Sequence, residues 1–212
     1  MTLDELIDRC RDDSGDEAAP YHCSDDDWTK YLNEAEEESC IRARLIEEVV
    51  DVAFAAGDDT IAVPERAFSI QSATVSGRKL SLYTLGDLNE ILPDGWDEDE
   101  GEVVACARHG NLLRPYRIPV ASGTVRLTAF CTPENPMVNG SDVPTIHSRY
   151  HVKLVDWALR CAYSKQNNEL YDKNLADRHE ARFEATFGPR PNEVEMQRIA
   201  IRRRRPARGN FI

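Results

Sequence analysis

The spacing of apolar residues changes twice along this chain, and that change limits the fold more than any other feature. Before about residue 59 and after about residue 133, apolar residues recur at the spacing of one helical face. Between residues 60 and 132 they alternate, and Ser76-Gly77, His109-Gly110 and Ser122-Gly123 separate the runs. The pattern predicts an α+β fold: a helical subdomain from both chain ends, with an inserted antiparallel β subdomain.

We therefore expect four segments in the 212-residue chain. They are N-terminal helices over residues 1–59, an antiparallel β subdomain over 60–132, a C-terminal helix pair over 133–188 and a C-terminal arm over 189–212. Inside the β subdomain, the polar insert over residues 87–101 reads as a surface loop.

The N-terminal helices have clear local signals. Leu3, Leu6 and Ile7 share one helical face, which predicts a short helix over residues 2–10. Ser24 and Asp27 then have the spacing of a capping box. A single helix is expected from about residue 28 to Gly57, where the glycine would stop it.

One face of this long helix is strongly acidic. Such a face is ordinarily solvated, but in a ring around DNA it would line a duct whose charge keeps DNA from adhering. The residues expected to line that channel are Glu34, Glu37, Glu38, Glu48 and Asp51. Arg42 and Arg44 lie among these acids and are expected at the interface between subunits.

Two helices are expected after residue 148. Val152, Val155, Leu159 and Ala162 form an apolar stripe over about residues 148–165. A second stripe ends at Gly188 and consists of Leu175, His179, Phe183 and Phe187. Together they predict an antiparallel helix pair.

Composition excludes several classes of protein. No apolar run is long enough to span a bilayer, and the first residues lack the pattern of a signal peptide, so we expect a soluble protein made in a cytoplasm with no membrane partner. The six cysteines are dispersed without a Cys-x-x-Cys pair, as expected for buried thiols.

Local signatures of catalysis are absent. The sequence has no Gly-rich phosphate loop, Gly-x-Ser-x-Gly elbow or His-Glu-x-x-His pair, so we expect no catalytic residue, no cofactor and no enzyme. His147 and His151 have metal-ligand spacing but no third partner, which favours capping or core roles. The acids at 25–27 and 97–100 lack the spacing of a metal loop, so no metal is expected.

Charge is distributed unevenly. Residues 1–100 carry a net charge of −19, residues 101–212 carry +7, and the whole chain carries −12. The arm combines basic and apolar residues that would anchor it on an acidic protein partner, with direct DNA binding and a solvated tail as alternatives. The expected partner-binding residues are Arg202, Arg203, Arg204, Arg205, Arg208, Phe211 and Ile212.

Three helical segments carry a resemblance to a known family. Trp28-x-x-Tyr31-Leu32-Asn33-Glu34-Ala35 opens the first of them. Tyr150-His151-x-x-Leu154-Val155-Asp156-Trp157-Ala158-Leu159 and His179-Glu180-Ala181-Arg182-Phe183-Glu184 form the others. Between about residues 28 and 188 the chain resembles the head-to-tail adaptors, or connectors, of tailed bacteriophages.

The resemblance implies a structural virion protein at the head-tail interface, synthesised in the bacterial host cytoplasm. Copies would form a ring, expected to be a dodecamer, beneath the portal protein. The ring would extend the DNA channel for transient passage of DNA and give tail or nozzle proteins a docking platform. An alternative is a nucleic-acid-associated regulatory or packaging protein that binds through the arginine-rich arm, and a more distant one is a metal-dependent hydrolase.

Overall fold

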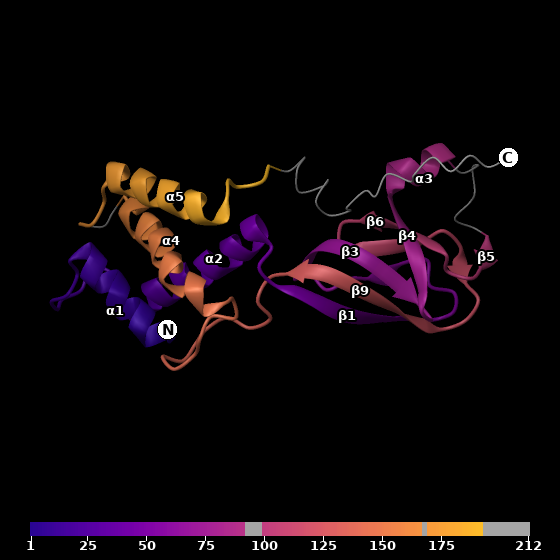
Figure 1. The fold of residues 1–212 in the computed structure, drawn as a ribbon, viewed down its shortest axis with the longest axis horizontal. Coiled ribbons are helices and arrows are strands. Elements are labelled where there is room, and N and C mark those ends of the chain that lie inside the picture. Colours follow the sequence, from indigo (N-terminus) through magenta and orange to yellow (C-terminus); the bar gives the residue numbers. More distant parts are fainter. Residues whose placement is uncertain (92–98, 167–168, 193–212) are drawn as a thin grey trace. The chain divides into compact units, whose positions relative to one another are not determined.

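The computed structural model describes residues 1–91, 99–166 and 169–192. They form two compact units, one from Met1–Ile46 with Thr132–Pro191 and the other from Glu47–Cys131. Helices α1, α2, α4 and α5 belong to the first, whereas the strands and α3 belong to the second (Figure 1). The α+β class is therefore confirmed.

Five helical elements build the first unit, the helical unit. They are α1 (Leu3–Ser14), α2 (Asp25–Ala43), the 3-10 turn η1 (Ser148–Tyr150), α4 (His151–Ser164) and α5 (Lys173–Phe187). The predicted capping box of α2 is confirmed, because Ser24 Oγ accepts from the Asp27 backbone N–H while the Asp27 side chain accepts from that of Ser24. α1 ends at Gly15, whose φ of 74° is left-handed.

The core of the helical unit surrounds α4, which packs against α1, α2 and α5. Leu3, Leu6 and Ile7 of α1 are buried in this core, as the pattern predicted. The stripe predicted for α4 is largely correct, but Val152 is 43% exposed. From α5, Phe183 is fully buried and its ring lies 5.0 Å from that of Trp157.

The second unit, the β unit, is a curled seven-stranded sheet. Its strands are β1 (Glu47–Phe54), β2 (Ile61–Ala62), β3 (Ala67–Val75), β4 (Arg78–Thr84), β6 (Ala105–His109), β7 (Leu112–Pro115) and β9 (Gly123–Cys131). Their order is β1-β9-β3-β4-β6-β7-β2, and β1 and β2 also contact each other. The short strands β5 (Glu100–Gly101) and β8 (Ile118–Pro119) form a separate pair.

Strand pairing departs in part from the antiparallel arrangement expected. β3 and β4 do form a hairpin, but β4 pairs with β6 in parallel, and so does β5 with β8. The chain between β4 and β6 also contains helix α3 (Leu85–Ile91), which overlaps the surface loop predicted from residue 87. Leu88 of α3 is buried and packs near Ala107 of β6, so this helix covers part of the sheet.

The prediction of one helix from residue 28 to 57 is wrong. α2 ends at Ala43 because Arg44 adopts a left-handed conformation, with φ 53°, and its N–H binds the Cys40 carbonyl. The chain then becomes β1, which pairs with β9 from Glu47↔Phe130 to Phe54↔Gly123. Residues from 47 onward therefore lie in the β unit, although the expected boundary was residue 59.

Candidate interaction surfaces

The acids of α2 divide between solvent and interior. Glu34 and Glu37 are exposed, whereas Glu36 and Glu38 are buried, at 1% and 8% exposure. Glu38 therefore does not lie on the solvated face expected from the sequence. The exposed pair borders a hollow of about 390 Å³ that Lys30, Asn33 and Pro133 also line.

The Glu36 side chain is hydrogen-bonded to the loop before α4. Its Oε1 accepts hydrogen bonds from the backbone N–H groups of Thr145 and Ile146. Burial of the carboxyl raises its pKa, and these two hydrogen bonds only partly oppose the rise. The sequence shows Glu36 as one of four glutamates on α2, with no signal that separates it from the exposed ones.

A buried cluster of opposite charges forms around Arg42. Its side chain is 1% exposed, and Nε donates to Glu38 Oε1 at 2.8 Å. Nη2 donates to Glu180 Oε1 at 2.9 Å, and Nη1 donates to the Gly188 carbonyl at 3.4 Å. Arg160 Nε completes the cluster 3.0 Å from Glu180 Oε2. The Arg42 charge thus acts within one subunit, binding α2 to α5.

Arg44 has a different setting. Its backbone ends α2, and the residue is only half-buried. Roles for Arg42 and Arg44 between subunits stay predictions.

The last two predicted channel acids belong to the β unit. Glu48 lies on β1, 2.6 Å from Arg66 Nη1. Asp51 accepts two hydrogen bonds from Arg126, at 2.8 and 2.9 Å, and these lower the pKa of its carboxyl. The five acids therefore do not share one helical face, because a strand replaces the second half of that helix. Their channel-lining role stays a prediction.

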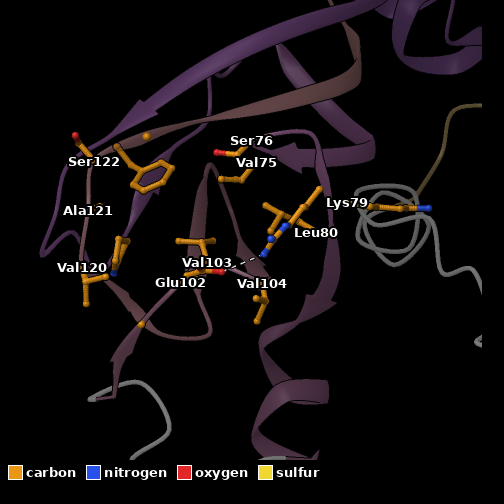
Figure 2. Close-up of a pocket in the computed structure, with 15 residues that line it drawn as sticks. Val75, Ser76, Lys79, Leu80, Glu102, Val103, Val104, Val120, Ala121 and Ser122 are labelled. Carbon is orange, nitrogen blue, oxygen red and sulfur yellow. Dashed lines mark hydrogen bonds and ion pairs between the residues drawn. The ribbon is translucent and has the colours of Figure 1, made fainter.

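The β unit contains a hollow of about 460 Å³ that sequence reasoning missed. Its wall is largely apolar, with Val75, Leu80 and Val103, and Figure 2 shows Lys79 extending away from these side chains. Arg78 and Glu102 form an exposed ion pair at the rim, 3.3 Å apart. The residues come from separate strand ends, so no local motif marks them. An apolar hollow with a charged rim suits an apolar side chain from another protein.

The histidines and cysteines serve the structure. His147 precedes α4 and accepts a hydrogen bond from the Arg149 backbone N–H, whereas His151 is buried and binds the Ile146 carbonyl at 2.9 Å. These are the capping and core roles expected. Burial raises the pKa of the Cys106 thiol to about 12 and that of Cys161 to about 11. Within the described ranges, no three His, Cys, Asp or Glu side chains are grouped to hold a metal ion.

The predicted arm contacts cannot be placed on either unit. Arg202–Arg205, Arg208, Phe211 and Ile212 lie outside the described residues. Among the described helices, none has the length and apolar content needed to cross a bilayer.

Comparison with known proteins supports the resemblance seen in the helices. No curated protein matches the chain. The family model described as SU10 adaptor protein, however, matches residues 1–209, which include both units. The resemblance to phage head-to-tail adaptors is thereby confirmed, and the chain belongs to the SU10 adaptor protein family.

Proposed function

We propose that this protein is a non-enzymatic structural adaptor that forms a ring, expected to be a dodecamer, between the portal and the tail of a phage virion. The family match over residues 1–209 carries the proposal, because it includes the helical unit, the β unit and most of the C-terminal arm. The ring extends the DNA channel and presents a docking platform for tail or nozzle proteins.

The charge of the chain supports passage of DNA without retention. The net charge is −12, and Glu34 and Glu37 are exposed on α2. Like charge repels the DNA backbone, so a duct lined by these residues would not trap its cargo. Of the five acids proposed for this role, Glu34, Glu37 and Asp51 are exposed, whereas Glu38 is buried and Glu48 is half-buried.

The arm is proposed to attach the ring to the portal. Arg202–Arg205 can form forked hydrogen bonds to carboxylates, and Phe211 and Ile212 can fill an apolar pocket. The hollow in the β unit, with its apolar wall, is proposed to receive a side chain from a tail component.

Binding to the cognate portal protein tests this function. The full chain should form a closed ring in native mass measurements and bind the portal. A chain ending at Gly188 should keep its fold and lose portal binding. A protein that stays monomeric, does not bind the portal and binds duplex DNA tightly at low salt would contradict the proposal. That outcome would favour the nucleic-acid-associated alternative.

A further inference from the structure

Helices α1 and α5 present exposed faces of different charge. The exposed residues of α1 include one base, Arg9, and five acids: Asp4, Glu5, Asp8, Asp12 and Asp13. On α5, Arg178 and Arg182 lie one turn apart on the exposed face, with Ala181 and Ala185 beside them. The α1 face is acidic, and α5 offers a basic edge next to small side chains.

The two faces point away from the same core. Both helices contact α4: Leu3, Leu6 and Cys10 of α1 are buried in the same core, and His179 and Phe183 of α5 meet Asp156 and Trp157 of α4. Figure 1 shows α1 and α5 on opposite sides of α4 within the helical unit. A subunit with two different, complementary faces on opposite sides can join its neighbours head to tail, which is the contact that closes a ring.

The charges on these faces are available for a partner. Asp8, Asp12 and Arg178 have no ion-pair partner among the residues that the structure describes, and Arg182 reaches only Asp156, at 3.9 Å. Within α1, Arg9 pairs with Asp13, at 3.0 Å, rather than with Asp8 or Asp12.

The spacing of the charges also matches. Asp8 and Asp12 are four residues apart, as are Arg178 and Arg182, so each pair spans about 6 Å along its helix. An antiparallel contact would place Asp8 opposite Arg182 and Asp12 opposite Arg178. Ala181 and Ala185 have short side chains, so a second helix can approach α5 closely there.

We infer that α5 of one copy docks on α1 of the next through these two pairs of charges. This inference rests on the proposed ring and specifies one contact between its subunits. Opposite charge at matched spacing selects the neighbour and its orientation, while like-charge contacts disfavour α1 against α1.

Two double variants test the contact by native mass and light scattering. Asp8→Lys with Asp12→Lys sets two lysines of α1 against the two arginines of α5, and Arg178→Glu with Arg182→Glu sets two glutamates of α5 against the two aspartates of α1. Each should weaken self-association at least tenfold, with unchanged thermal unfolding because all four residues are exposed. Reversing the exposed charges of Lys30 and Lys153 to Glu is the matched control and should leave assembly intact.

Mixing the two double variants is the decisive step. Neither variant should assemble alone. In a mixture, the lysines on α1 of one variant can pair with the glutamates on α5 of the other. The unchanged α1 of the second variant can pair with the unchanged α5 of the first. An equal mixture should therefore assemble again with equal numbers of both chains. Assembly of the wild type and of both variants alone would overturn the α1–α5 contact and leave the ring proposal standing. A wild type that stays monomeric at low salt and high concentration would overturn both.

Discussion

Arg42 of α2 and Glu180 of α5, 138 residues apart, are joined by a hydrogen bond of 2.9 Å between Nη2 and Oε1. The guanidinium carbon of Arg42 also lies 5.1 Å from the ring centre of Trp157 on α4. One side chain from the N-terminal part of the chain therefore connects both C-terminal helices. The connection adds to the packing of α1 and α2 on α4, which joins two sequence segments that are separated by the whole β unit.

Replacing Arg42 with Ala should destabilise the helical unit strongly. Removing one partner of a buried ion pair leaves an unpaired charge, so the free energy of unfolding should fall by about 3 kcal/mol. Arg160 and Arg190 still contact Glu180 and Glu38, which places the loss near the lower end of the usual range. Chemical denaturation of the full chain measures it. Arg178→Ala, on exposed α5 surface, should change the value by less than about 0.5 kcal/mol. If Arg42→Ala and Arg178→Ala lowered the free energy of unfolding equally, burial of the Arg42 ion pairs would not be the cause of the loss.

The turn between β3 and β4 offers a stabilising substitution. Ser76 and Gly77 form a two-residue loop in which both φ angles are positive, at 49° and 78°. Asn tolerates this conformation better than Ser and is preferred before Gly in such hairpins. Ser76→Asn should therefore raise the free energy of unfolding by roughly 0.5 kcal/mol. Ser122→Asn is the matched control, because Ser122 is exposed in a loop without positive φ, and it should have little effect. A loss of stability at Ser76 would show that its hydroxyl matters more than the backbone conformation.

The sequence predicted elements with strong local signals correctly. Leu3, Leu6 and Ile7 on α1 and His179, Phe183 and Phe187 on α5 define faces that are buried in the structure. Residues 45–54 were ambiguous, because Leu45, Val49 and Val52 fit a helical stripe while Glu47–Phe54 also alternates. The signal that ends α2 is an arginine in a left-handed conformation, and such positions usually hold Gly or Asn.

Non-local contacts explain what the sequence could not reveal. The parallel pairing of β4 with β6 joins strands separated by α3, and no local residue preference encodes it. Burial of Glu36 and Glu38 also depends on partners far along the chain, the backbone of residues 145–146 and the C-terminal helices. Helical spacing alone placed Glu38 with the exposed acids, although its neighbours in space are arginines from α2 and beyond α5.

The buried carboxyl of Glu36 should make stability depend on pH. Its pKa is raised by burial, so the folded state binds a proton more readily than the unfolded state does. The contribution of Glu36 to the free energy of unfolding is most favourable below the ordinary pKa of Glu. It is lost as the pH rises through the raised pKa of the folded state. Glu36→Gln keeps an oxygen for the Thr145 and Ile146 N–H groups and removes the buried charge.

The Gln variant should therefore be more stable than wild type at neutral pH, with a difference that disappears in acid. Thermal unfolding of both proteins across pH 3 to 8 measures this. Glu37→Gln, at the exposed neighbouring position, should show no such pH-dependent difference. A Gln variant less stable than wild type at pH 7 would mean that the two backbone hydrogen bonds need the charged carboxylate.

The arm should bind the portal through two separable contributions. Residues 189–212 could span about 80 Å when extended at roughly 3.3 Å per residue, far enough to reach beyond their own subunit. Replacing Arg202–Arg205 with Ala removes charge–charge contacts that salt screens, so portal binding should weaken at least tenfold at low salt and less at high salt. Phe211→Ala removes apolar contact and should weaken binding with little dependence on salt. Gln197→Ala, also in the arm, is the control and should bind as wild type does. Binding isotherms at several ionic strengths separate the contributions, and parallel salt dependences for the arginine and phenylalanine variants would refute this division of roles.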